Sequence, residues 1–274
     1  MRLSELVRLA LDEDVGPGDR TTEACVPAAA LGSATIRAKA HLVVCGHDEA
    51  TEVFRQVGAQ YTPQVTEGDA VSPGTVISVV EGPMRALLTG ERLALNFLMK
   101  LSGIATHTRE MVEAAGGLRI VDTRKTSPLL RAQERRAVRI GGADNHRFAL
   151  YDGILIKDNH IVAAGGITAA VQAARQHAHH LLRIEVETED RAQVAEAIEA
   201  GADVVMLDNM DDDTMAQIIA QWRGHCLFEA SGNLDLQRLP RLVGVGVDVA
   251  SIGGLIHQAR WADLSMKMTG RAPS

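Results

Sequence analysis

A repeating pattern of short apolar runs, separated by helical patterns, constrains the fold of the second half of this chain more than any other feature. After Gly117 the runs read LRIVDT, GILIK, LRIEVE, DVVMLD, CLFEAS and VDVASIGG. Helical patterns such as ITAAVQAARQHA and RAQVAEAIEAG lie between them. Strand, helix and strand at this spacing predict βαβ units with a parallel sheet. Six such runs in succession favour closure into an α/β barrel over an open sheet.

Charged or hydrogen-bonding residues end every one of these runs. They are Arg124 and Lys125, Lys157, Glu187, Asp208, Glu229 with Ser231, and Ser251 with Gly253 and Gly254. In α/β barrels the carboxyl ends of the strands form one rim, and active sites are built on that rim. Polar residues also end strands simply because loops are exposed to solvent. Solvent exposure explains any single position but not all six together. We therefore expect the chemistry of the chain at this rim.

Positive charge is concentrated in the segment from Ile120 to Ile161. Between Arg119 and His160 there are nine Lys or Arg and five Asp or Glu, whereas the whole chain has a net charge of −7. Cations gathered against the overall charge indicate a bound anion, because electrostatic focusing depends on local charge. Four of the arginines are interpreted as the solvated face of a basic helix: Arg131, Arg135, Arg136 and Arg139. Four other cations have site-like surroundings: Arg124, Lys125, Arg147 and Lys157.

The first hundred residues predict a smaller α+β domain without obvious chemistry. Helical spacing occurs at residues 2–13 and 47–57, and a longer helix opens at Pro83 with an interruption expected near Ser102-Gly103. Strand-like runs occur at residues 33–45, 61–65 and 75–81. The predicted division is an N-terminal domain over residues 1–105 and a barrel domain over residues 106–262. The C-terminal tail, residues 263–274, is expected to return to the N-terminal domain.

Composition excludes several classes of protein. The chain has 274 residues, of which 46% are hydrophobic and 3% aromatic, enough for one large or two unequal α/β domains. No apolar run approaches the roughly 18 residues of a membrane span, and charges interrupt the start of the chain, so we expect a cytoplasmic protein. An acidic chain with few aromatics argues against nucleic-acid binding. The three cysteines, Cys25, Cys45 and Cys226, are expected to be buried reduced thiols.

Two kinds of group share the predicted rim. The cations suit carboxylates or phosphates, which arginine can bind through two oxygens at once. Glu187 and Asp208 suit a divalent metal or sugar hydroxyls, and the lack of a His or Cys cluster favours Mg²⁺ over zinc. The last two runs end in Ser231-Gly232-Asn233 and Ile252-Gly253-Gly254, where small residues allow backbone N–H groups to approach a phosphate. These patterns predict a site for an aromatic acid and a phosphorylated sugar.

A series of motifs resembles one family closely. The motifs are GDRTT, GERLALNFLMKLSGIAT, DTRKTSPLLR, AVRIGGADNHRFALYDGILIKDNHI, EVE, MLDN, EASGN and SIGGL. They resemble, in order, those of quinolinate phosphoribosyltransferase, also called nicotinate-nucleotide pyrophosphorylase (carboxylating). The resemblance implies a small N-terminal sandwich domain joined to an incomplete TIM-like α/β barrel. It also implies a homodimer, with a hexamer left open, and the Mg²⁺-dependent conversion of quinolinate and PRPP to nicotinate mononucleotide, pyrophosphate and CO₂ in NAD biosynthesis.

The resemblance also implies roles for individual residues. Arg92 would enter the partner's site, and Glu187 and Asp208 would bind ribose hydroxyls and Mg²⁺. Lys157 would lie between the two substrates. The carboxylates of quinolinate would be held by Arg124, Lys125, His146 and Arg147. The implied substrate-binding residues are Arg92, Thr123, Arg124, Lys125, His146, Arg147, Lys157, Glu187, Asp208, Ser231, Gly232, Asn233, Ile252, Gly253, Gly254 and His257. The implied catalytic residues are Lys125, Lys157, Glu187 and Asp208. Glu185 remains an alternative to Glu187, with a supporting role preferred for it.

Three other functions remain open from the sequence. A paralogous phosphoribosyltransferase would keep this fold and the PRPP site but take another aromatic acid. A Schiff-base aldolase would use a lysine at a strand end, Lys125 or Lys157, although the surrounding arginines disfavour it. A binding protein without activity would not need acidic and basic groups to converge on one rim. Substrate profiling, borohydride trapping and PRPP binding without turnover would separate these three possibilities.

Overall fold

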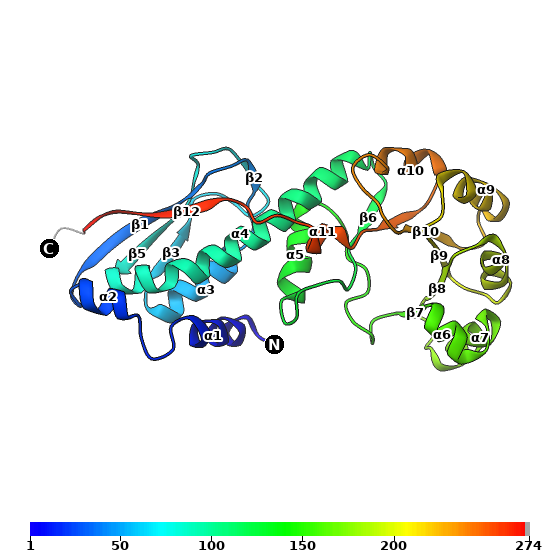
Figure 1. Cartoon of the computed structure of the whole chain (residues 1–274), viewed down its shortest axis with the longest axis horizontal. Coiled ribbons are helices and arrows are strands. Elements are labelled where there is room, and N and C mark those ends of the chain that lie inside the picture. Colours follow the sequence, from blue (N-terminus) through cyan, green and yellow to red (C-terminus); the bar gives the residue numbers. More distant parts are fainter. Residues whose placement is uncertain (272–274) are drawn as a thin grey trace. The chain divides into compact units, whose positions relative to one another are not determined.

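The computed structural model describes residues 1–271, which form two compact units (Figure 1). The first unit contains Met1–Arg109, Ser127–Gly142 and the chain from Gln258 onward, and the second contains Glu110–Thr126 and Ala143–His257. The domain ranges predicted from the sequence, 1–105 and 106–262, do not coincide with these units. The segment Ser127–Gly142, for example, belongs to the first unit. The end of the predicted tail, residues 272–274, lies outside the described residues.

A four-stranded antiparallel sheet forms the centre of the first unit, with strand order β12-β1-β5-β3. Its strands are β1 (Leu31–Ala38), β3 (Gln60–Pro63), β5 (Val76–Pro83) and β12 (Leu264–Arg271). A separate pair is formed by β2 (Leu42–Val43) and β4 (Ala70–Val71). Alternate residues of β1, Ala34, Ile36 and Ala38, are buried because successive side chains of a strand point to opposite faces. The alternation in the sequence therefore predicted this strand and its buried face.

Five helices accompany this sheet among the described residues. They are α1 (Leu3–Asp14), α2 (Arg20–Cys25), α3 (His47–Val57), α4 (Met84–Ala114), which runs on into the second unit, and α5 (Arg131–Gly141). The expected interruption near Ser102-Gly103 was wrong, because α4 is continuous there. A Cβ atom at Gly103 would collide with the carbonyl of Arg260. The glycine therefore permits close backbone approach and does not break the helix.

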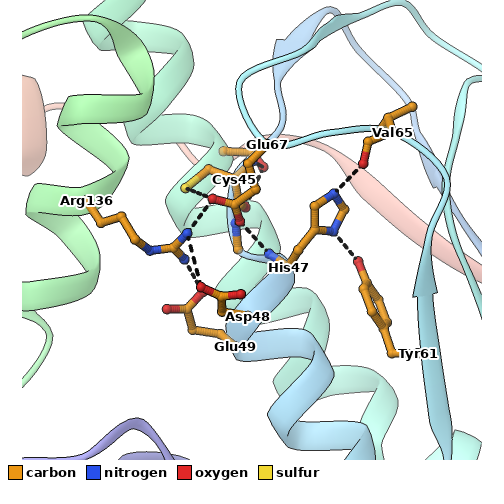
Figure 2. Close-up of polar contacts among 10 residues, drawn as sticks. Cys45, His47, Asp48, Glu49, Tyr61, Val65, Glu67 and Arg136 are labelled. Atoms are coloured by element: carbon orange, nitrogen blue, oxygen red, sulfur yellow. Dashed lines mark hydrogen bonds and ion pairs between the residues drawn. The ribbon is translucent and has the colours of Figure 1, made fainter.

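Helix α5 carries the basic residues that we interpreted as a solvated face, and this interpretation was wrong for Arg135 and Arg136, whereas Arg139 is exposed. Arg135 is buried, and Arg136 forms ion pairs with Glu67 and, at 2.5 Å, with Glu49 (Figure 2). Glu49 itself is buried on α3. Arg136 thus supplies the countercharge for the buried Glu49 carboxylate. A buried carboxylate is costly unless it is paired with a positive charge.

Glu67 joins this ion pair to the start of helix α3. One oxygen of its carboxylate accepts hydrogen bonds from the backbone N–H groups of Gly46 and His47, both at 2.8 Å (Figure 2). These are orphan donors at a helix N-terminus, where a negative charge is stabilising. The His47 ring lies beside this start, with Nδ1 2.7 Å from the Tyr61 hydroxyl and Nε2 3.1 Å from the Val65 carbonyl. We call Arg136, Glu49, Glu67 and the start of α3 the Arg136 cluster. This cluster ties α5 to α3 within the first unit.

A six-stranded parallel sheet forms the second unit, with order β6-β11-β10-β9-β8-β7. Its strands are β6 (Arg119–Val121), β7 (Ile154–Ile156), β8 (Ile184–Thr188), β9 (Val204–Asp208), β10 (Leu227–Ser231) and β11 (Val249–Ser251). Its helices are α6 (Asp158–Ala164), α7 (Ile167–His177), α8 (Arg191–Glu199), α9 (Asp212–Trp222), α10 (Leu239–Val245) and α11 (Gly254–His257). β6 and β7 are the end strands of this sheet, each hydrogen-bonded to one neighbour (Figure 1). The predicted incomplete α/β barrel is thus confirmed. The sheet does not close, because β6 and β7 are not paired with each other.

The environments of the cysteines agree with the sequence only in part. All three thiols are free, but Cys25 is exposed, so the expectation of burial was wrong for it, whereas Cys45 is buried and Cys226 is intermediate. Burial raises the pKa of the Cys45 thiol, which keeps it protonated at neutral pH. Within residues 1–271, no helix combines the length and apolar character that crossing a membrane requires. The cytoplasmic location stays a prediction.

Replacement of Arg136 by methionine should lower the free energy of unfolding by about 3 kcal/mol, because two carboxylates would lose their countercharge. Burial already raises the pKa of Glu49 against the opposing effect of Arg136. The deficit should therefore shrink as the pH falls and Glu49 takes up a proton. Urea unfolding at pH 5 and pH 8 measures both effects.

The matched control is Arg8→Met, which removes an ion pair to Asp12 whose side chains are 57% and 62% exposed. That change should cost less than about 1 kcal/mol. Equal losses for the two variants would contradict a structural role for the Arg136 cluster.

Candidate active site

The parallel register brings the carboxyl ends of the strands of the second unit to one edge. Ser231 of β10 lies opposite Asp208 of β9 and Ser251 of β11, and Ser251 lies opposite Val121 of β6. Parallel strands run in the same direction, so residues that end different strands meet on the same side of the sheet. The polar residues at the ends of these separate runs therefore share one edge.

Two arginines that the sequence marked as site-like lie near each other at this edge. Burial, together with the positive charge of Arg124, lowers the pKa of Arg147, although a guanidinium stays charged at neutral pH. Arg147 also donates to the Gly153 carbonyl at 2.9 Å. The Nε of Arg124 is buried and has no hydrogen-bond partner among the described residues. Two like charges and an orphaned donor are satisfied together by an anion such as a carboxylate.

His146 lies against two buried carboxylates, a grouping that we call the His146 triad. Its Nε2 is 3.1 Å from Glu185 and 3.6 Å from Glu229, and both glutamates are buried. The other oxygen of each carboxylate has no hydrogen-bond partner among the described residues. In that part of the chain, this is the only group of three or more His, Cys, Asp or Glu side chains close enough to hold a metal ion. The imidazole Nε2 therefore contacts both acids directly.

Burial and pairing act on the charge of His146 in opposite directions. Burial lowers its pKa, but the hydrogen bonds and negative charges of Glu185 and Glu229 outweigh that effect and raise the pKa to about 10. The amide N–H of Arg147 points at Nδ1 from 2.8 Å, and this contact needs a lone pair that a protonated ring lacks. Burial also raises the pKa of Glu185. The triad thus keeps a proton shared between His146 and its acids.

Asp122, directly after β6, holds the segment that carries these groups. It is fully buried, and its two oxygens accept hydrogen bonds from the Asn145 side chain at 2.7 Å and from the His146 backbone at 2.9 Å. A buried carboxylate that accepts two hydrogen bonds fixes its donors firmly, because leaving them unpaired is costly. Asp122 therefore sets the position of both His146 and the following Arg147.

The two acidic residues assigned to sugar or metal binding end neighbouring strands. Glu187 on β8 forms an ion pair with Lys157, which lies just after β7, and Asp208 ends β9. Both supply only oxygen ligands at adjacent strand ends, which is the donor set that Mg²⁺ prefers. Of the two glutamates in β8, Glu187 therefore contacts a rim cation, whereas Glu185 belongs to the buried triad. The chemistry of these donors fits Mg²⁺, and the assignment stays a prediction.

The glycine-rich ends of β10 and β11 have different reasons for their small residues. Gly232 has φ of 91° and Asn233 has φ of 49°, both in the left-handed region that few side chains adopt. A Cβ at Gly253 would lie 2.8 Å from the Lys125 side chain and 3.3 Å from both His257 Nε2 and Thr123 Oγ1. The structure thereby brings Thr123, Lys125, Gly253 and His257 together, and only a residue without a side chain fits at position 253.

Not every predicted residue belongs to this unit. Arg92 is an exposed residue of α4 in the first unit, and its predicted role in a partner's site stays a prediction. Ile252 is buried, so its backbone is the part that can meet a ligand. Neither the role of Asp122 nor the pairing of Glu229 with His146 was predicted from the sequence. Asp122 directly follows an apolar run, as strand-end residues commonly do, and the pairing of Glu229 left no signal in the sequence.

The fold and the site define a class of protein: an incomplete α/β barrel whose strand ends carry cations and carboxylates for anionic ligands. Comparison with known proteins makes the assignment specific. Two family descriptions match, the quinolinate phosphoribosyl transferase N-terminal domain over residues 19–102 and the C-terminal domain over residues 104–267. The chain belongs to the quinolinate phosphoribosyltransferase family, and it is an enzyme of the pentosyltransferase class.

Relatives from distant organisms match almost the whole chain. A probable nicotinate-nucleotide pyrophosphorylase [carboxylating] of Bacillus subtilis is 43% identical over 98% of this chain and 94% of its own length. The human nicotinate-nucleotide pyrophosphorylase [carboxylating] is 38% identical over 97% and 91%. The crystal structure of NadC from Streptococcus pyogenes is 39% identical, covers 99% of this chain and 97% of its own, and superimposes with a TM-score of 0.94.

Replacement of either acid of the triad by glutamine should lower the pKa of His146, because each carboxylate stabilises the protonated ring. In the double variant, Glu185→Gln with Glu229→Gln, burial acts alone and the pKa should fall below its ordinary value of 6.5. Histidine ¹⁵N chemical shifts, followed by NMR across pH 5 to 11, report both the pKa and the nitrogen that carries the proton. A pKa near 6.5 in the unaltered protein would contradict the pairing.

The same pairing predicts how stability depends on pH. Because the pKa is raised in the folded state, the pairing contributes fully below about pH 6.5 and is lost as the pH rises through about 10. The free energy of unfolding should therefore decline over this range, and the double glutamine variant should show a smaller decline. Chemical unfolding at pH 6, 8 and 10 measures the difference.

Proposed function

We propose that this enzyme transfers the phosphoribosyl group of PRPP to quinolinate and releases pyrophosphate and CO₂, giving nicotinate mononucleotide for NAD biosynthesis. The names of the relatives support the reaction, since they are called nicotinate-nucleotide pyrophosphorylases [carboxylating] or, in Nicotiana glauca, quinolinate phosphoribosyltransferases [decarboxylating]. The observation that carries the proposal is the pair Arg124 and Arg147, two neighbouring cations with an orphaned donor at the edge of the sheet.

The cations suit the acceptor, because quinolinate carries two carboxylates on adjacent ring carbons. Arg124 and Arg147 would bind one carboxylate each or share one, and the nearby triad places His146 on the same side. One cation 4 Å from a carboxylate contributes about 4 kcal/mol at an effective dielectric of 20, before the cost of desolvation. Nicotinate has a single carboxylate and would leave part of this charge unpaired.

The other strand ends suit the donor. We propose that Glu187 and Asp208 bind the ribose hydroxyls of PRPP and Mg²⁺, and that Ser231–Asn233 and Ile252–Gly254, with His257, bind the phosphate on the ribose. When bound, Mg²⁺ neutralises the charge that develops on the departing pyrophosphate. Thr123 and Lys125 lie beside Gly253, so Lys125 adds a cation to this phosphate end.

Positioning and charge account for the chemistry without a covalent nucleophile. Loss of pyrophosphate leaves positive charge on the ribosyl carbon, and the Glu187 carboxylate stabilises that charge while Lys157 holds Glu187 in place. The pyridine nitrogen of quinolinate, oriented by Arg124 and Arg147, then forms the bond to carbon. The resulting pyridinium favours loss of the adjacent carboxylate as CO₂, because the electron pair left on carbon lies beside a cationic nitrogen. That carbon then takes up a proton from water, which completes the ring C–H bond of the product.

The test of this function is to incubate the purified protein with quinolinate, PRPP and Mg²⁺ and to follow nicotinate mononucleotide by mass spectrometry. Nicotinate replaces quinolinate in a parallel reaction, and chelation of Mg²⁺ with EDTA tests the metal. Product from quinolinate alone, lost with EDTA, supports the proposal. Binding of PRPP without product from either acid would favour the paralogue that uses another aromatic acid.

Arg147→Ala should raise the KM for quinolinate at least tenfold and leave the KM for PRPP within about twofold, because only the acceptor side loses a cation. Steady-state kinetics with each substrate varied in turn measures both constants. The control is Arg191→Ala, an exposed arginine of α8 that contacts Gln221 and Trp222. An unchanged KM for quinolinate in Arg147→Ala would remove Arg147 from the acceptor site.

We further propose a homodimer in which Arg92 of one subunit enters the site of its partner, with hexamers left open. Arg92→Ala and Arg147→Ala should each be nearly inactive at low quinolinate. Mixed after partial dissociation, they should recover about a quarter of wild-type activity, because half the dimers are hybrids with one intact site each. No recovery, with hybrid dimers detected by native mass spectrometry, would place Arg92 in the site of its own subunit.

A further inference from the structure

Asn209, the residue after Asp208, has an unusual backbone conformation at the end of β9. Its φ is 55°, in the left-handed region, and it is one of three non-glycine residues with positive φ among the described residues, together with Leu129 and Asn233. Asparagine tolerates this conformation better than most residues. The turn directs the chain so that the Asn209 backbone N–H donates to the Ser231 carbonyl at 3.0 Å. The ends of β9 and β10 are thereby joined just beyond the last paired residues.

The side chain of Asn209 makes a second connection between the same two strand ends. Its Nδ2 donates to Oδ2 of Asp208 at 2.7 Å, and its Oδ1 accepts from Nδ2 of Asn233 at 3.2 Å. Within residues 1–271, this amide is the only hydrogen-bond donor to the Asp208 carboxylate in the structure. One oxygen of Asp208 is thus fixed by Asn209, and the other is left for a ligand.

The surroundings show that hydrogen bonds, not packing, hold this side chain. Asn209 is exposed and lines an open hollow of about 770 Å³. On its other side Gly232 lies so close that a Cβ there would collide with the Asn209 amide. Glycine is therefore favoured at position 232 for two reasons. It leaves space for the Asn209 side chain, and it tolerates the positive φ of 91°. Removal of the amide would leave the Asp208 carboxylate without a fixed orientation.

Arg238 forms hydrogen bonds with both of these loops, the one after β9 and the one after β10. Its guanidinium donates to the carbonyls of Met210 at 2.6 Å and Gly232 at 3.3 Å, and to the Asp212 carboxylate at 2.9 Å. It does not contact Asp208, so it supports the backbone of the loops without orienting that carboxylate. The two loops would therefore keep their course if the Asn209 side chain were lost.

We propose that Asn209 is a positioning residue for the phosphoribosyl donor, because it sets the Asp208 carboxylate at a fixed distance and angle from the Ser231–Asn233 loop. This inference rests on the proposed function, in which Asp208 binds ribose hydroxyls or Mg²⁺ and the Ser231–Asn233 loop binds the ribose phosphate. Both groups belong to one PRPP molecule, so their separation has to match it. Asn209 fixes that separation before the substrate arrives, which reduces the ordering cost of binding.

The variant Asn209→Gly tests the proposal, because glycine accepts the positive φ and removes only the amide. Calorimetric titration with PRPP and Mg²⁺ should show a Kd raised about five- to twentyfold, whereas the Kd of quinolinate stays within twofold. Asn209→Ser, whose hydroxyl is too short to reach both partners, should give the same direction. Leu129→Gly, at an exposed position with φ of 68°, controls for added glycine at positive φ and should leave both constants unchanged.

A second arm shows whether Asn209 acts through Asp208. In the Asp208→Asn background the Asn209→Gly change should raise the PRPP Kd by less than twofold, because the carboxylate that it orients is gone. An equal penalty in both backgrounds, or an unchanged PRPP Kd in Asn209→Gly and Asn209→Ser, would overturn the proposal. These affinities are measured without turnover, so absence of nicotinate mononucleotide from the wild-type protein would count against the proposed function alone.

Discussion

Parallel pairing of six short strands is the constraint on which the rest of the second unit depends. Because every strand runs in the same direction, the residues that follow β6, β7, β8, β9, β10 and β11 reach one edge of one sheet. No single strand carries a recognisable site: β8 contributes one carboxylate to that edge and β10 a small polar loop. The pairing turns six weak features into one cluster of charge, and the buried His146 triad then fixes how part of that charge is placed.

Much of the fold was predictable, because hydrophobic periodicity reports directly on burial. The alternation in β1 and the helical spacing of α3 identified both elements, and the recurring apolar runs identified the parallel sheet. The errors arose at positions where contacts with residues far away in the sequence determine the local structure or the burial of a side chain. Ser102-Gly103 resembles a helix break, but the glycine admits the backbone of Arg260. Arg136 resembles a solvated residue, but its partners Glu49 and Glu67 are more than sixty positions away in the sequence.

The candidate site was predictable in its ligands and less so in its supports. Residues such as Arg124, Lys157 and Asp208 end apolar runs, and a run with a charge at its end is visible in the sequence. The groups that hold them are not visible in this way, because their role is a hydrogen bond to a particular neighbour. Asp122 looks like an ordinary strand end until it is seen to accept from Asn145 and the His146 backbone. Asn209 is a common turn residue whose two amide contacts depend on β10 lying beside β9.

The strand order of the first unit has a consequence for synthesis of the chain. β1 lies between β5 and β12, and β12 is formed by Leu264–Arg271. While a ribosome is still making the barrel, β1 has an unpaired edge of N–H and C=O groups, the kind of edge that recruits strands from other chains. The sheet of the first unit is therefore completed only after the strands of the second unit have been made. A nascent chain stalled or truncated before residue 264 would carry an open sheet, so the first unit depends on β12 to cover the edge of β1.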